Sequence, residues 1–264
     1  DWLLDFLHSP ASTKQRMDDA VWNVFRTEVY RVIGKTPTEQ PAETMAQEVV
    51  NVLLQSLIDN SIDGLLLDVY YQWADSTEKA DVLRRYVENY ALPTDIDPLK
   101  VHSNHPFAEL DRKVMKMLSE ALKLQKDATS IVAFIKARTS SKKAKLFKPA
   151  WLNSVLTLST FSIKGLNNVS DYSQMSEFYL QNFAKLDTAM RKIYVAWLND
   201  EPTLRPLQEH YTQFNNELLT KWYSIGCKYI PTQKDIVAKA LASTKRTAVV
   251  VCDGLRLEIA ESIV

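Results

Sequence analysis

The sequence predicts a mainly α-helical protein, in which a multi-helix N-terminal region leads into the first β-strand of an α/β domain. Of its 264 residues, 46% are hydrophobic and 24% are charged, as in soluble globular proteins. It contains only five glycines, whereas sheet-rich folds use glycine in tight turns and bulges. Apolar residues recur at spacings of three and four through the first 240 residues, which is the period of a helix.

The helices of the first half have recognisable ends. A first helix is predicted between Ser12, as its N-cap, and Gly34, which suits the C′ position. Pro41 suits the first turn of the next helix, because proline lacks the N–H that this turn would leave unpaired. Before Pro93, the pattern therefore predicts helices at 12–34, 41–59, 65–73 and 76–92.

The segment 93–106 contains three prolines and is predicted to be irregular. A long basic helix is expected from Phe107, and another after Ser130. A polar loop at 139–148 and an apolar segment at 151–161 follow. A helix of about 25 residues begins at Ser173. Pro202 and Pro206 are expected to separate it from a helix at 207–224.

The end of the chain has a different pattern. Pro231 is expected to open a short helix, and residues 247–252 form a continuous run rich in β-branched residues. Such a run is typical of a strand buried on both faces, as in a parallel sheet. It ends at Asp253, and a further helix is predicted at 255–263. Ligands bind at the carboxyl ends of parallel strands, so Asp253 is a candidate metal ligand, although many α/β proteins place an Asp-Gly turn there for conformational reasons alone.

Residues 249–261 read Val-Val-Val-Cys-Asp-Gly-Leu-Arg-Leu-Glu-Ile-Ala-Glu, and this segment resembles the start of the PglZ domain. The family pattern is an apolar strand followed by Asp-x-x-Arg, an aromatic or apolar residue, and Glu. Asp253, Arg256 and Glu258 match it, while Leu257 stands where family members often have an aromatic residue. The resemblance is sharp over 229–264 and only architectural before that.

PglZ proteins belong to bacteriophage-exclusion (BREX) defence systems, and their PglZ domain is similar to the metal-dependent alkaline-phosphatase superfamily. The resemblance implies a helical N-terminal region at 1–228 and the truncated start of the PglZ domain at 229–264. The N-terminal region would act in assembly of the defence complex, with a methyltransferase, an ATPase and small accessory subunits as partners. Asp253 would bind a divalent metal, with zinc expected, in the intact protein. The nucleophile and other ligands would follow Val264, so we expect this chain alone to bind no metal and to be inactive.

Charge is segregated along the chain although the net charge is zero. Residues 1–111 carry 9 basic and 19 acidic side chains, whereas 112–148 carry 11 basic and 2 acidic ones. The acid-free part of this basic segment contains Lys136, Arg138, Lys142, Lys143, Lys145 and Lys148. These cations predict either contact with a nucleic-acid backbone, which would make the chain a DNA-binding module, or pairing with the acidic segment or a partner.

Two smaller features complete the prediction. His102 and His105 are three residues apart, which could suit zinc, but they lack cysteine partners and are expected to be surface loop residues. Cys227 and Cys252 cannot form a disulfide framework, which favours a reducing, cytoplasmic setting. No apolar run reaches the ~20 residues of a membrane span. Because the chain begins with Asp1, it is expected to be a piece of a longer protein.

Overall fold

The computed structural model describes residues 2–226, 233–242 and 259. The regular secondary structure of these residues is helical, with no strand among them, which confirms the mainly α prediction. The helices divide into two compact units, unit 1 at residues 1–152 and unit 2 at residues 153–264. The predicted strand at 247–252 and Asp253 lie outside the described residues.

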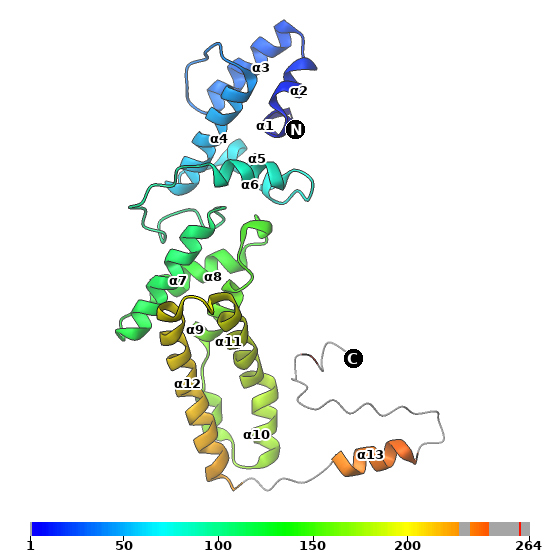
Figure 1. Ribbon diagram of the computed structural model, residues 1–264, viewed down its shortest axis with the longest axis vertical. Helices are drawn as coiled ribbons and strands as arrows, with labels where there is room; N and C mark the ends of the chain where they lie inside the picture. Colours follow the sequence, from blue (N-terminus) through cyan, green and yellow to red (C-terminus); the bar gives the residue numbers. More distant parts are fainter. Residues whose placement is uncertain (1, 227–232, 243–258, 260–264) are drawn as a thin grey trace. The chain divides into compact units, whose positions relative to one another are not determined.

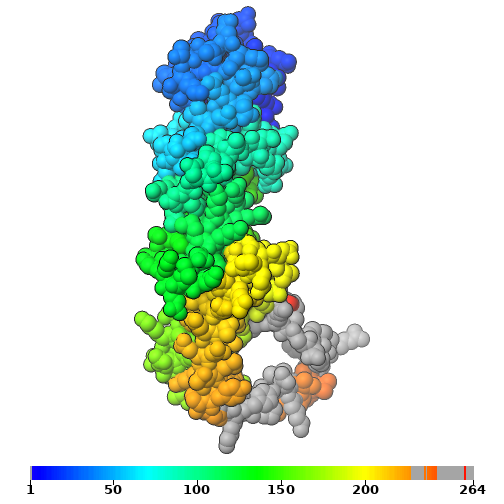
Figure 2. Space-filling view, turned by 60° about the vertical axis from the view of Figure 1, so that its left-hand side comes forward, coloured from blue at the N-terminus to red at the C-terminus, as the bar shows by residue number. Residues whose placement is uncertain are grey.

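Unit 1 consists of helices joined by short connections and one long irregular segment (Figure 1). Its side chains form a densely packed body in the space-filling view, coloured blue through green (Figure 2). The elements are α1 (Trp2–His8), α2 (Pro10–Gln15), α3 (Asp19–Val32), α4 (Ala42–Ile58), α5 (Gly64–Ala74), α6 (Ala80–Glu88), α7 (Ala108–Lys123), α8 (Thr129–Ser140) and the 3-10 turn η1 (Lys145–Phe147).

The predicted helix at 12–34 is wrong at its start. Ser12 lies inside α2, and the N-cap of α3 is Asp18, whose carboxylate accepts a 2.8 Å hydrogen bond from the Val21 amide. The predicted stop is confirmed, because Gly34 follows the helix with φ at +68°, a conformation that glycine adopts without strain. Of the residues with apolar helical spacing in this segment, Val29 and Ile33 are buried, whereas Val21 and Val24 are exposed.

Helix α4 supplies the centre of the unit 1 core. Its predicted apolar face is confirmed, and its buried residues include Met45, Val49, Leu53 and Leu57. Helices α1 and α2 both pack against α4. Burial of a whole leucine side chain is worth roughly 1.5–3 kcal/mol, so this face is a major source of the stability of unit 1.

Unit 2 is also helical. It contains α9 (Leu152–Thr160), η2 (Lys164–Asn168), α10 (Tyr172–Phe178), the π-helical turn η3 (Tyr179–Phe183), α11 (Ala184–Trp197), α12 (Glu201–Ser224) and α13 (Gln233–Leu241). The predicted 25-residue helix is present as the continuous run α10, η3 and α11. Helices α11 and α12 pack side by side (Figure 1). The rings of Phe161, Phe183 and Phe214 meet edge to face with centroids 5.1–5.7 Å apart.

The predicted separation of helices α11 and α12 is confirmed, but it lies at 198–200 and not at Pro202 and Pro206, because both prolines lie in α12. Pro202 is in the first turn, where no helical N–H bond is lost. Pro206 lies one turn further and lacks the N–H that would bond to the Pro202 carbonyl. Its ring is buried with Leu204 and Leu207, and this packing offsets the missing hydrogen bond.

Candidate functional site: a buried ion pair beside an aromatic pocket

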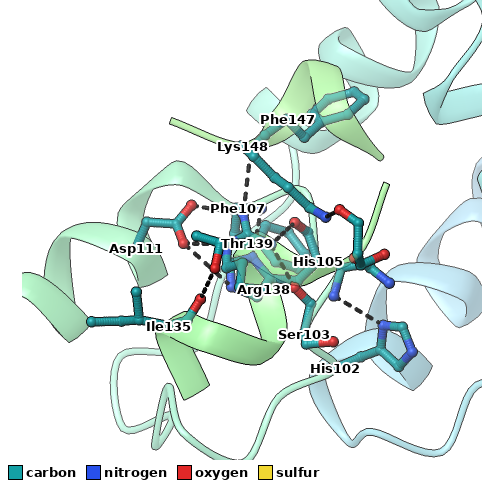
Figure 3. Close-up of polar contacts among 12 residues, drawn as sticks. His102, Ser103, His105, Phe107, Asp111, Ile135, Arg138, Thr139, Phe147 and Lys148 are labelled. Carbon is teal, nitrogen blue, oxygen red and sulfur yellow. Dashed lines mark hydrogen bonds and ion pairs between the residues drawn. The ribbon is translucent and has the colours of Figure 1, made fainter. Parts of the chain in front are cut away.

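A charged residue interrupts the apolar face of each of two neighbouring helices in unit 1. Asp111 lies in the first turn of α7, on the same face as the buried Val114 and Leu118. Arg138 lies in the last turn of α8, on the face of the buried Phe134 and Ile135. Both charged side chains have no solvent exposure. Because helices α7 and α8 pack together, the two charges meet inside the unit (Figure 3).

The Arg138 guanidinium uses all five of its N–H groups. Its Nε donates to Asp111 Oδ1, and one Nη2 hydrogen bond reaches Asp111 Oδ2 at 2.7 Å, so the pair is bidentate. Nη1 donates to the carbonyls of Ser103 at 2.8 Å and His105 at 3.0 Å, and Nη2 also donates to the Phe147 carbonyl at 3.3 Å. Arg138 therefore ties α7, α8 and two loops together.

The Arg138 guanidinium favours the charged form of the Asp111 carboxylate. Burial raises the pKa of this carboxylate above the usual 3.8, and the Arg138 guanidinium opposes that rise. The bidentate geometry returns to both carboxylate oxygens the hydrogen bonds they lost on leaving water. A buried pair of this kind stabilises little by itself, but removing one partner leaves an unpaired buried charge.

His105 is a core residue and not the predicted surface loop residue. It has no solvent exposure, and its ring stacks between those of Phe107 and Phe134 at 6.1 and 6.2 Å. Nδ1 accepts a hydrogen bond from the Phe107 amide, so the neutral ring carries its hydrogen on Nε2, which lies 3.9 Å from Asp111 Oδ1. Burial and the nearby Arg138 charge lower the pKa of His105 well below 6.5, so the ring is neutral.

The pairing of His102 with His105 as zinc ligands has no support in the described residues. His102 is half-buried, and its Nδ1 accepts a hydrogen bond from the Asn104 amide. Burial lowers the pKa of His102. Within residues 2–226, 233–242 and 259, no three His, Cys, Asp or Glu side chains are grouped so that they could hold a metal ion. Asp253, the predicted metal ligand, lies outside these residues.

The six predicted cations of the basic segment occupy two different environments. Lys136, Lys142, Lys143 and Lys145 are exposed. Arg138 is buried in the ion pair, and Lys148 is half-buried and donates a 2.8 Å hydrogen bond to the Ser141 carbonyl.

Two of the exposed lysines, Lys143 and Lys145, lie beside helix α5, which belongs to the acidic part of the chain. The Lys143 ammonium lies 5.5 Å from the centre of the Tyr71 ring, and the Lys145 backbone amide donates to Asp75. This loop thus contacts the acidic segment at Asp75, while the side chains of Lys142, Lys143 and Lys145 remain at the surface.

A pocket of about 510 Å³ lies next to the ion pair, entirely within unit 1. Phe107 and Phe147 both line it. Arg138 donates hydrogen bonds to the Phe147 carbonyl and to the carbonyl of His105, close to Phe107 in the chain. The pocket's other lining residues come from the end of α6, the following segment, the start of α7 and the loop around η1 and are Arg84, Val87, Glu88, Tyr90, Leu92, Pro106, Ala108, Glu109, Leu146, Lys148 and Pro149.

Four charged side chains line this pocket, and they are Arg84, Glu88, Glu109 and Lys148. The Arg84 guanidinium lies 5.9 Å from the centre of the Phe147 ring, in a cation–π geometry. Burial and the charge of Arg138 lower the pKa of Lys148 to about 8. Glu109 lies 3.5 Å from Lys113, which offsets its negative charge.

The burial of Asp111 and Arg138 had a signal in the sequence. Each is an ionisable residue at a helical spacing of three or four from buried apolar residues, on a face where charge is costly. Two opposite charges placed this way on successive helices indicate a buried pair. The burial of His105 had no such signal, because it depends on Phe134, which is 29 positions away in the sequence.

The arrangement can hold loops in a fixed geometry and offers a small, partly apolar cavity with cations at its rim. It contains no nucleophile and base within hydrogen-bond reach of each other at the pocket, among the described residues. Comparison with known proteins adds no relative to this picture: no family model, no curated protein and no solved structure matches the chain.

Proposed function

We propose that this chain is the helical N-terminal region of a PglZ-type BREX bacteriophage-defence protein and acts in assembly of the defence complex. The observation that carries the proposal is the segment 249–261, whose Asp253, Arg256 and Glu258 fit the opening motif of the PglZ domain. The described helices at 2–226 agree with the long helical region that precedes this domain in the family. In the intact protein, a metal-dependent phosphohydrolase-like domain would follow.

An assembly role requires a surface for partners, and helix α11 offers a candidate. Tyr194, Val195 and Leu198 lie on one face of the helix or directly after it, and they are 43%, 77% and 53% exposed. Contiguous exposed apolar side chains are a feature of protein–protein contact sites, whereas single ones are common on any surface. We assign this face to the docking of another component of the defence system, such as its methyltransferase or ATPase.

In this proposal the divalent metal belongs to the intact protein, with Asp253 as one of its ligands. When bound, such a metal would polarise a phosphoryl oxygen and activate a nucleophile. With the other ligands missing, Asp253 alone would not hold a divalent ion against water. The purified 264-residue chain should therefore hydrolyse no phosphomonoester or phosphodiester above background with zinc, manganese or magnesium.

Co-purification tests the assembly role. The tagged chain, expressed with the other components of the defence system, should retain at least one of them. Val195→Asp should reduce that retention, while Lys192→Ala, an exposed change on the same helix, should not. Melting temperatures close to the wild type would show that both variants fold. Retention of no component by the wild-type chain would contradict the proposal.

A second candidate function is binding to duplex DNA through the basic segment. The observation in its favour is the exposure of Lys136, Lys142, Lys143 and Lys145 on one loop and the adjoining helix end. Against it, Arg138 is buried in an ion pair and Lys148 already donates to a carbonyl, so the number of free cations is smaller than the sequence indicated.

In the described residues, no helix has both the length and the apolar character needed to cross a membrane. We propose a cytoplasmic location, as for the family that the sequence resembles.

A further inference from the structure

The pocket beside the Asp111–Arg138 pair has the size and lining of a small-molecule site. Its volume of about 510 Å³ falls within the roughly 300–1,000 Å³ of ligand pockets. Tyr90 and Phe107 contribute rings whose centroids are 5.8 Å apart, and Phe147 contributes a third ring. A planar apolar group would find aromatic surfaces from three segments of the chain.

Two cations at the rim have hydrogen-bonding capacity to spare. Arg84 is exposed, and none of the described side chains or carbonyls accepts a hydrogen bond from its guanidinium, which lies over the Phe147 ring. Lys148 makes one hydrogen bond, to the Ser141 carbonyl, and an ammonium group has three N–H donors. An anionic group at this rim would accept hydrogen bonds from both side chains.

The acidic residues of the rim do not cancel this preference. Glu109 lies 3.5 Å from Lys113, so its charge is offset from outside the pocket. Glu88 remains, which leaves the pocket with a small positive excess. The first turn of α7 is at the same wall, and no side chain caps its N-terminus, so the helix dipole adds to the positive potential.

The order of the pocket walls depends on the buried pair. Arg138 donates to the carbonyl of Phe147 and to the carbonyl of His105. His105 lies two residues before Phe107 in the chain. The Lys148 ammonium is thereby held close to the Arg138 charge and partly away from water. Asp75 and Asp111 oppose this effect only in part, since the pKa of Lys148 is still lowered to about 8, and an anion beside the ammonium would favour its charged form.

We propose that this pocket binds a small planar aromatic molecule that carries one anionic group, with the ring among Tyr90, Phe107 and Phe147 and the anion on Arg84 and Lys148. The anion is a phosphate or a carboxylate, since both accept hydrogen bonds from guanidinium and ammonium groups. This site is independent of the assembly role and of the PglZ resemblance.

Isothermal titration of the 264-residue chain tests the proposal with two matched pairs of probes. Adenosine monophosphate is compared with adenosine, and indole-3-carboxylate with indole. We expect the anion of at least one pair to bind at least about fivefold more tightly than its neutral partner, as for a charge-assisted hydrogen bond at a partly exposed site. Which pair shows the difference distinguishes a phosphate ligand from a carboxylate ligand.

Variants locate the binding. Arg84→Met and Lys148→Met should each weaken the anion by about fivefold or more, and Lys148→Arg should restore part of the affinity. Glu88→Gln should strengthen binding. Arg85→Met is the matched control, because Arg85 is exposed on α6 but does not line the pocket, and it should change nothing. Arg84 is at the surface, so its variant will fold even if the Lys148 variant does not.

The proposal is overturned if no probe binds with a Kd below about 5 mM, or if adenosine and indole bind as tightly as their anions. It is also overturned if Arg85→Met weakens binding as much as Arg84→Met. In an NMR titration with the same probes, chemical-shift changes confined to residues outside the pocket would overturn it as well.

Discussion

Substitution of Arg138 by methionine should destabilise unit 1 severely, because the change removes one partner of a buried ion pair. Asp111 would keep its position inside the unit with no counter-charge. Breaking a buried pair in this way costs about 3–5 kcal/mol. Three backbone carbonyls, those of Ser103, His105 and Phe147, would also lose a donor.

The double variant Arg138→Met/Asp111→Leu separates these two contributions. With both charges gone, the loss that remains comes from the three carbonyls, at about 1 kcal/mol each, or about 3 kcal/mol in total. The double variant should therefore be more stable than Arg138→Met, which has both losses. Its loss should fall short of the sum of the single losses by about 3 kcal/mol or more.

Urea unfolding followed by circular dichroism measures the free energies, and native-state hydrogen exchange of the α7 and α8 amides places the loss in unit 1. Arg205→Met in unit 2 is the control, because Arg205 and Glu209 form an exposed pair that should contribute within about 0.5 kcal/mol. A loss below about 1 kcal/mol for Arg138→Met, or strictly additive losses in the cycle, would refute the role of this pair.

Three further outcomes are expected. His105 has a pKa well below 6.5 in the folded chain, and His102 and His210 are shifted in the same direction, so the unfolded chain takes up protons first on acidification. The free energy of unfolding should be at its full value above about pH 6.5 and fall below it by up to ~1.4 kcal/mol per pH unit for each histidine. His105→Phe should make the urea midpoint fall less steeply with decreasing pH, and an unchanged slope would contradict the assignment. If the four exposed lysines of the basic segment contact DNA, log affinity against log salt should have a slope of about −4, and the triple alanine variant of Lys142, Lys143 and Lys145 should reduce its magnitude by about 3; a slope near zero in the wild type would exclude this function. In the intact protein, Asp253→Ala should lower the bound zinc measured by mass spectrometry and abolish phage defence at an unchanged melting temperature, whereas full metal occupancy in the variant would show that Asp253 is not a ligand.

The helices were largely predictable because their signals are local. The face of α4 from Met45 to Leu57 follows from spacing alone, and Gly34 marks a helix end through its own conformational freedom. The α3 face was predictable only in part, since Val29 and Ile33 are buried but Val21 is half exposed. Pro206 misled because burial of its ring outweighs a single lost hydrogen bond.

The candidate site was less predictable because it is assembled from distant parts of the chain. Helical spacing places Arg138 and Asp111 on buried faces, but the pairing itself depends on the packing of α8 against α7, which joins residues 27 positions apart. The pocket likewise joins Arg84 to Lys148, which no sequence motif connects. Tertiary contacts of this kind decide which charges are available to a ligand.

The π-helical turn η3 at Tyr179–Phe183 sets the rotational register of the helix that follows it. A π turn holds more residues than an α turn, so each residue advances by ~80° instead of ~100° about the axis. Tyr179 and Asp187, eight residues apart, therefore lie on nearly the same side, and the Tyr179 hydroxyl donates to Asp187 Oδ2 at 2.7 Å. Tyr211 of α12 donates to the other oxygen at 2.7 Å. The extra residue of the π turn thus brings Asp187 to the two tyrosine hydroxyls where α11 packs on α12. Removal of a single residue from 180–183 would restore the α-helical register and turn Asp187 away from both tyrosines.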